Sequence, residues 1–287
     1  MSDAILDQAA PACVLRTIDG PVCTIHLNRA EARNPLGADT VQALSQAVRE
    51  ASQAPGVRAI VFTAAGTAFS AGGNLGNLQD RLDAPAGRDG RDPIAAGNRR
   101  YGDFLTELSR VPQVTMACVQ GPAMGGGAGL ACAVDIAIGS PLARFGFPEA
   151  SIGLVPGQIL PFVAARLGLQ AARRLVLTAE RIDAVEAHRI GLLDYLAESP
   201  QELMPLVRRV LRSIVATAPQ ASAATKRLLG GLPVAPLPAS EALQGYLDAA
   251  ADLFARQMRS EAPEGVAAAR ERRPASWNQA AGLNLGI

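Results

Sequence analysis

Two apolar, β-branched segments of this chain each run into a glycine-rich turn. Residues 57–63 are followed by the turn at residues 70–74 (Ser-Ala-Gly-Gly-Asn), and residues 114–119 by the turn at residues 121–127. Apolar runs of this length are typical of strands buried on both faces, and glycine lets a ligand approach the main chain closely. Two such turns facing one point would direct a pair of backbone N–H donors at an oxygen that becomes negative.

The order of the other predicted elements indicates an α/β body. Residues 14–18 and 22–27 are predicted to be two strands joined by a turn at residues 19–21, and a helix follows with Asp39 as its cap. Residues 80–97, rich in Gly, Pro, Asp and Arg, are predicted to form a mobile loop.

From residue 201 onward every segment has helical character, so we expect a core over residues 1–200 and a helical region over residues 201–287. With 49% hydrophobic residues the chain can bury a large core, and a net charge of only +1 gives no indication of binding to nucleic acid or membrane through bulk charge. The N-terminal segment does not resemble a signal peptide, and the four cysteines lie in apolar stretches without CxxC spacing. We therefore expect buried thiols and a cytoplasmic protein.

Glu149 is the candidate acid/base. It follows Phe147 and Pro148 and precedes Ile152, and a carboxylate among these apolar side chains would be partly desolvated. Desolvation suits it to exchange a proton near neutral pH. The two histidines, His26 and His188, are far apart and form no metal-binding pattern, and the triple glycine is not part of a GxGxxG fingerprint.

Taken together, these motifs resemble the enoyl-CoA hydratase/isomerase superfamily, the crotonases. The resemblance spans residues 22–277 and is carried by residues 27–34, 68–75, 121–127, 147–149, 153–156, 264–265 and 272–273. It implies a crotonase-type α/β fold, a spiral of ββα turns with a helical C-terminal oligomerisation region. It also implies an acyl-CoA thioester as substrate, no permanently bound cofactor, no metal, and a homotrimer or dimer of trimers.

The resemblance also assigns roles to individual residues. The N–H groups of Gly73 and Gly126 would form the oxyanion hole, and Glu149 would exchange a proton with the substrate carbon chain. Further residues match positions that line the substrate or coenzyme A, with Arg272 placed against the CoA phosphates: Arg29, Ala32, Arg33, Ala71, Leu75, Gly129 and Arg272.

Gly129 is the main departure from the family pattern. Hydratases of the family carry their first catalytic glutamate at this position, whereas members with a single glutamate include double-bond isomerases. Residues 147–159 and 127–132 nevertheless resemble isohexenylglutaconyl-CoA hydratases of acyclic terpene breakdown. With Gly129 the pocket would lose a negative charge and gain volume, which would suit a branched or anionic substrate, and Arg81, Arg88 and Arg91 could meet its distal carboxylate.

The prediction from sequence is therefore a hydratase that adds water to an α,β-unsaturated, branched or glutaconyl-type enoyl-CoA. Two alternatives remain open: an enoyl-CoA isomerase that uses the same glutamate, and a non-catalytic acyl-CoA-binding oligomer.

Overall fold

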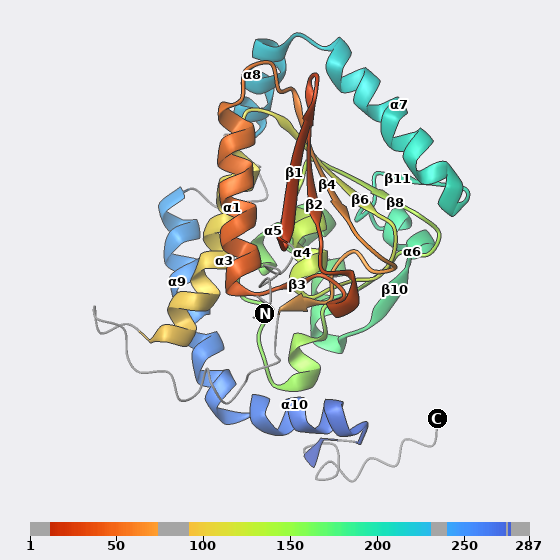
Figure 1. Cartoon of the computed structure of the whole chain (residues 1–287). Helices are drawn as coiled ribbons and strands as arrows, with labels where there is room; N and C mark the ends of the chain where they lie inside the picture. The colour runs from red at the N-terminus through yellow and green to blue at the C-terminus, as the bar shows by residue number, and fades with distance from the viewer. Residues whose placement is uncertain (1–11, 74–91, 231–239, 274, 277–287) are drawn as a thin grey trace, which may run out of the picture.

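A six-stranded sheet lies at the centre of the molecule (Figure 1). The structure is a computed structural model and describes residues 12–73, 92–230, 240–273 and 275–276. The strand order is β1-β2-β4-β6-β8-β11, with β1 antiparallel to β2 and the other neighbours parallel. These strands are β1 (Val14–Asp19), β2 (Val22–Leu27), β4 (Ala59–Ala64), β6 (Val114–Val119), β8 (Ile136–Gly139) and β11 (Tyr195–Leu196).

Helices cover the sheet and extend beyond it (Figure 1). The α-helices are α1 (Ala38–Gln53), α3 (Pro93–Arg110), α4 (Gly126–Ala133), α5 (Leu160–Thr178), α6 (Ala184–Arg189), α7 (Leu203–Ala216), α8 (Pro219–Gly230), α9 (Ser240–Ser260) and α10 (Ala262–Glu271). The described ranges also contain the short 3-10 helices η1 (Ala30–Ala32), η2 (Pro148–Ile152) and η3 (Pro200–Glu202).

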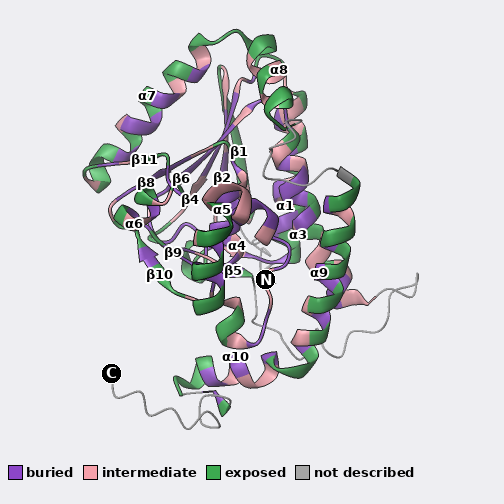
Figure 2. Cartoon of the chain, turned by 180° about the vertical axis from the view of Figure 1, so that it is seen from behind, coloured by how far each residue is buried: buried purple, intermediate pink, exposed green. Residues whose placement is uncertain are grey.

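Strand β4 is buried on both faces, as its apolar sequence predicts (Figure 2). Ile60 and Phe62 belong to the main apolar core, together with buried residues of α1, α3, α4 and α5. Ala59 and Val61 belong to a second cluster, whose other members include buried residues of α7. Successive side chains of a strand point to opposite faces, so the sheet is enclosed between these two sets of helices.

Two small sheets carry the glycine turns. Strand β3 (Pro35–Leu36) pairs with β5 (Gly72–Gly73), so the first turn is anchored beside the start of α1. Strand β7 (Ala123–Met124) pairs with β9 (Arg144–Gly146), which also pairs with β10 (Arg181–Asp183). The segment that contains Glu149 follows β9 directly, so this sheet places Glu149 next to the second turn.

The helices after residue 200 are integrated with the rest of the chain. Helix α9 runs beside α3, and the two share an apolar cluster that includes Ile94, Ala251 and Met258 (Figure 1). Helix α10 packs on η2 so closely that a Cβ at Gly265 would lie 2.5 Å from the Ile152 carbonyl oxygen. The division of the chain near residue 200 stays a prediction.

Two local predictions are wrong. Helix α3 begins at Pro93, inside the predicted loop, because the Asp92 carboxylate accepts the N–H groups of Ile94 and Ala95 and caps the helix. Asp39 is not the cap of α1, which begins after Gly37; Asp39 lies in the first turn and forms an ion pair with Arg29 at 2.7 Å.

No helix in the described part of the chain combines the length and apolar character needed to cross a bilayer.

Candidate active site

The main chains of the two glycine turns lie against each other. The Ser70 carbonyl oxygen accepts the N–H of Met124 at 2.9 Å. Gly72 has a φ of +83°, and a Cβ there would lie 2.5 Å from the Met124 carbonyl oxygen and 3.3 Å from the Gly126 nitrogen. Only glycine allows both this backbone conformation and this close approach. The first turn therefore ends within contact distance of the second.

Asn34 holds the first turn in place. Its side chain is buried, and its Nδ2 donates to the carbonyl oxygens of Ala65 at 2.9 Å and Ala68 at 3.0 Å. The N–H of Ala71 donates to the carbonyl oxygen of Arg33 at 2.8 Å. Arg33, which the resemblance assigns to substrate or coenzyme A binding, is thus hydrogen-bonded through its main chain to the turn that contains Gly73.

The second turn opens helix α4. Gly126 is the first residue of this helix, so its N–H belongs to the group that has no acceptor within the helix. The Tyr101 hydroxyl donates to the Gly126 carbonyl oxygen at 2.5 Å and fixes the turn from the side of α3. Gly73 and Gly126 both line one cavity of about 360 Å³.

Glu149 reaches the same cavity from η2. Its Oε1 lies so near Gly125 that a Cβ there would be 2.7 Å from this oxygen, which places the carboxylate beside the second turn. Burial raises the pKa of Glu149 to about 7, against a smaller lowering from its own backbone N–H. Its Oε2 is buried and has no hydrogen-bond partner among the described residues. The predicted desolvation of this carboxylate is confirmed.

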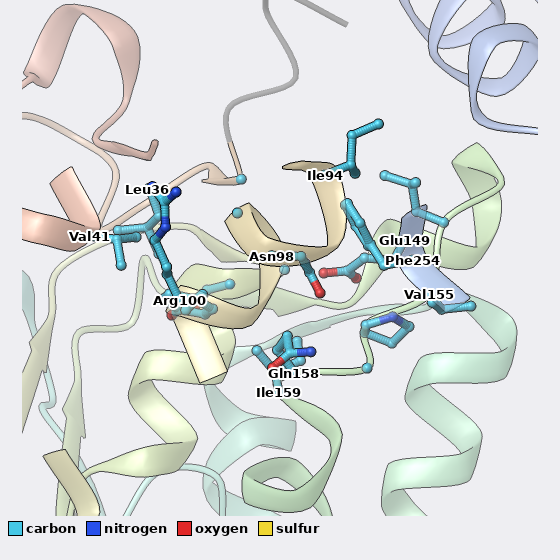
Figure 3. Close-up of a pocket in the computed structure, with 18 of the residues that line it drawn as sticks. Leu36, Val41, Ile94, Asn98, Arg100, Glu149, Val155, Gln158, Ile159 and Phe254 are labelled. Carbon is cyan, nitrogen blue, oxygen red and sulfur yellow. The ribbon is translucent and has the colours of Figure 1, made fainter. Parts of the chain in front are cut away.

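The rest of the cavity is mostly apolar. Figure 3 shows Leu36, Val41 and Arg100 on one side of the cavity and Glu149, Val155 and Phe254 on the other. Phe254 comes from α9, so the helical region contributes to the wall. The other lining residues are Gly37, Ala38, Ala71, Pro93, Ile94, Gly97, Asn98, Tyr101, Gly125, Pro148, Ile152, Leu154, Pro156, Gly157, Gln158 and Ile159.

Besides Tyr101, three polar side chains of the described wall were not predicted. Asn98 and Arg100 lie on α3, and Gln158 lies before α5. The Asn98 Oδ1 and the Gln158 Oε1 are buried without a hydrogen-bond partner among the described residues. Arg100 is exposed, and no described residue forms an ion pair with it. Helical periodicity could have indicated that Asn98 shares a face with Tyr101, but not that this face meets Glu149.

Gly129 does not enlarge the cavity, so that prediction is wrong. It is buried in α4, and a Cβ there would lie 2.4 Å from Cγ2 of Ile159. Ile159, which is 2% exposed and lines the cavity, occupies the adjacent space. The predicted loss of a charge holds for the described part of the wall, in which Glu149 is the single carboxylate.

The other predicted contact residues are more scattered. Ala71 lines the cavity, whereas Arg29 is paired with Asp39 and Ala32 lies in η1. Arg33, in a left-handed conformation, ends η1. Arg272 is exposed at the end of α10, also left-handed. Leu75, Arg81, Arg88 and Arg91 lie outside the described residues.

Other polar candidates have structural partners. His26 Nδ1 is hydrogen-bonded to Thr63 Oγ1 at 2.8 Å, and the Asp135 carboxylate accepts the N–H of Thr115 at 2.7 Å and pairs with Lys226 at 2.6 Å. Within the described ranges, no group of three His, Cys, Asp or Glu side chains is placed to hold a metal ion. All four cysteines are free, and Cys13 alone is only half-buried.

Comparisons with known proteins agree with this arrangement. The sequence model of the enoyl-CoA hydratase/isomerase family matches residues 17–280. A short-chain-enoyl-CoA hydratase from Clostridium acetobutylicum is 33% identical over 213 residues, which cover 74% of this chain and 78% of that protein. A crystal structure of an enoyl-CoA hydratase/isomerase from Marinobacter aquaeolei has a TM-score of 0.74 and 37% identity, covering 92% of this chain and 98% of its own.

The Pseudomonas aeruginosa AtuE structure is similar to the same extent, with a TM-score of 0.71 and 35% identity over 92% of this chain and 99% of its own. The mixed sheet, the converging glycine turns and the C-terminal helices are therefore those of the crotonase fold. This chain belongs to the enoyl-CoA hydratase/isomerase family.

Proposed function

We propose that this protein adds water across the α,β double bond of an enoyl-CoA thioester. The N–H groups of Gly73 and Gly126 bind the thioester oxygen. Ionised Glu149 takes a proton from water as the water oxygen bonds to the β carbon, and the electrons of the double bond move onto the thioester oxygen as an enolate. Glu149 then gives its proton to the α carbon as the enolate collapses, so one water is added and the carboxylate is restored.

The position and pKa of Glu149 are the observation that carries this proposal. A carboxyl group with a pKa of about 7 is partly ionised near neutral pH, and it can both accept and return a proton there. It lies beside the turn that supplies Gly126, so the thioester carbonyl and the carbons next to it would be within reach. The hydrogen bond from Tyr101 supports this turn from helix α3.

For the substrate we propose a branched or glutaconyl-type acyl group with a second carboxylate. The wall is largely apolar, which suits a branched chain. Arg100, which forms an ion pair with no described residue, lies on the side of the cavity opposite Glu149 (Figure 3). A guanidinium can bind a carboxylate through two parallel hydrogen bonds. Arg100 takes the role that the sequence suggested for Arg81, Arg88 and Arg91.

An isomerase is the second candidate, and one observation favours it. The wall has a single described carboxylate, and an isomerase needs only one base to move a proton between two carbons. The Gly129–Ile159 contact leaves no room for the second carboxylate that would help to hold a water.

A panel of CoA thioesters with product analysis by mass separates these functions. The panel contains crotonyl-CoA, methylglutaconyl-CoA, isohexenylglutaconyl-CoA and a 3-enoyl-CoA. Faster gain of one water on the glutaconyl esters supports the proposal, and faster reaction of crotonyl-CoA would contradict the substrate class. A shift of the 3-enoyl bond without mass change would indicate an isomerase, and binding without turnover would indicate a non-catalytic oligomer.

The Arg100→Leu variant tests the substrate class within one protein. Loss of the guanidinium should raise KM for a glutaconyl ester about tenfold or more, because a charged hydrogen-bonded partner contributes about 1.5–3 kcal/mol. KM for crotonyl-CoA, which has no second carboxylate, should stay unchanged and is the internal control.

The assembly that the family resemblance implies, a trimer or a dimer of trimers, is tested by light scattering of the same preparation.

A further inference from the structure

Asn98 and Glu149, two residues of the cavity wall, each have a buried acceptor atom. The Asn98 Oδ1 and the Glu149 Oε2 both lack a hydrogen-bond partner among the described residues. Figure 3 shows the Asn98 amide oxygen directed toward the Glu149 carboxylate. A carbonyl oxygen and an ionised carboxylate oxygen both accept hydrogen bonds and cannot bond to each other. Buried polar atoms in native proteins are nearly always paired. When Glu149 is ionised, a water that donates one hydrogen to each atom would satisfy both.

The donor groups of Tyr101 and Gln158, two other polar residues of the described wall, are bonded to main-chain oxygens. The Tyr101 hydroxyl donates to the Gly126 carbonyl oxygen. Gln158 donates from Nε2 to the Leu247 carbonyl oxygen at 2.8 Å, and its Oε1 is pressed against Gly102, where a Cβ would lie 2.0 Å away. Arg100 has donors only. Among the acceptor atoms of the wall that have no described partner, the Asn98 Oδ1 is the one directed toward the Glu149 carboxylate in Figure 3.

The Gly129–Ile159 contact explains why a second acceptor is needed. A nucleophilic water has two hydrogens, and a single carboxylate holds only one of them in a fixed direction. Position 129 cannot supply the other acceptor, because Ile159 fills the space next to Gly129. Helix α3 approaches the cavity from a different side and brings Asn98 there instead.

We propose that Asn98 is the second water-binding group of this site and replaces the carboxylate that position 129 lacks. One hydrogen of the water donates to the Asn98 Oδ1 and the other to the Glu149 Oε2. The water oxygen bonds to the β carbon, its proton passes to Glu149, and the second hydrogen stays on the new hydroxyl group. This inference rests on the proposed hydratase function and assigns one residue to it.

The Asn98→Leu variant tests this role in the full-length protein. It keeps nearly the same volume and removes the acceptor. We expect kcat for hydration of the best panel substrate to fall about 10- to 100-fold, as for the loss of one hydrogen bond in a charged network. KM should stay within about threefold, since the CoA ester itself loses no contact.

A second reaction distinguishes water binding from general damage. Exchange of the α hydrogens of a saturated acyl-CoA for solvent deuterium needs Glu149 and the oxyanion hole but no water at the β carbon. Asn98→Leu should therefore retain this exchange while it loses hydration. Equal loss of both reactions, or hydration at the wild-type rate, would refute the role of Asn98.

The Asn98→Asp variant tests the role even if Asn98→Leu folds poorly. It keeps an acceptor at the same place, so hydration should be retained. Two neighbouring carboxylates raise the pKa of one of them, so the rate should rise at a higher pH than in the wild type. Arg100 and Tyr101 on α3 are the other titratable side chains of the described wall, and this substitution changes neither of them. An unshifted pH profile would place Asn98 away from Glu149 and contradict the proposal.

Gln113→Leu is the matched control. Gln113 is also a buried amide whose Oε1 has no partner among the described residues, but it is not part of the cavity wall. Its substitution should leave both reactions unchanged. If the wild-type protein hydrates no member of the panel, the proposed function fails along with this inference; if it does and Asn98→Leu matches it, only the inference fails.

Discussion

Positions 149 and 129 are those at which the family resemblance places two catalytic glutamates, and the structure treats them in different ways. At position 149 the carboxylate is kept, and burial raises its pKa to about 7. At position 129 there is no side chain, and Ile159 fills the space. The fold has thus preserved one acid/base group and closed the other position with an apolar side chain. A glycine in place of a catalytic residue does not by itself mean an enlarged pocket.

Glu149→Gln should have the largest effect. It removes the group that accepts and returns the proton, while the amide keeps the size of the side chain. Loss of general acid–base catalysis costs about 10²- to 10⁴-fold in rate. Steady-state kinetics should show this loss in kcat, and calorimetry should show CoA-ester binding that is nearly unchanged. Turnover close to wild type would remove Glu149 from the mechanism.

Gly129→Glu should destabilise the fold instead of restoring a second catalytic group. A Cβ at position 129 would lie 2.4 Å from Ile159, and insertion of atoms into a filled core typically costs about 1–3 kcal/mol, occasionally more. Denaturant unfolding measures this cost. The double variant Gly129→Glu/Ile159→Ala should recover part of the lost free energy of unfolding; if the single variant is as stable as wild type, the two positions are not coupled as described.

The pKa of Glu149 predicts opposite effects of pH on rate and on stability. Hydration needs the ionised carboxylate, so the rate should rise about tenfold per pH unit below about 7 and level off above it. The folded pKa lies above the ordinary value of 4.5, so the folded chain binds more protons between these two values. This group therefore lowers the free energy of unfolding as pH rises from 4.5 to about 7.

Glu149→Gln is the control for both pH effects, because it cannot ionise. Rate–pH profiles and denaturant unfolding at several pH values measure them. Two outcomes would mean that the carboxyl group is not desolvated. One is a wild-type rate that stays constant from pH 5 to 8. The other is a difference in free energy of unfolding between the wild type and Glu149→Gln that does not change with pH.

Tyr101→Phe should have the smallest effect. It removes the hydrogen bond to the Gly126 carbonyl oxygen but leaves the ring, and a neutral hydrogen bond typically contributes about 1 kcal/mol. We expect a roughly fivefold lower kcat, since about 1.4 kcal/mol corresponds to a factor of ten. The free energy of unfolding should change by a similar amount. A loss as large as that of Glu149→Gln would mean that Tyr101 acts on the substrate directly.

Much of the fold could be predicted from the sequence. Strand β6 (Val114–Val119) has its predicted bounds, and β4 is buried on both faces as predicted, because a continuous apolar run needs no information from the rest of the chain. The start of α3 was missed although its signal was present: Asp92 followed by Pro93 is a favourable helix start. The surrounding residues are rich in Gly, Pro, Asp and Arg, and this composition favoured the prediction of a loop.

The sequence by itself determined the chemical groups: the glycines of two turns, and one glutamate among apolar neighbours. These follow from local order along the chain, which fixes backbone freedom and the polarity of nearby side chains. Only the tertiary structure decided that Asn98 faces Glu149, that Ile159 fills the space beside Gly129, and that Phe254 closes the wall. Each of these contacts joins segments far apart in sequence, and such contacts depend on how helices pack, which local patterns do not encode.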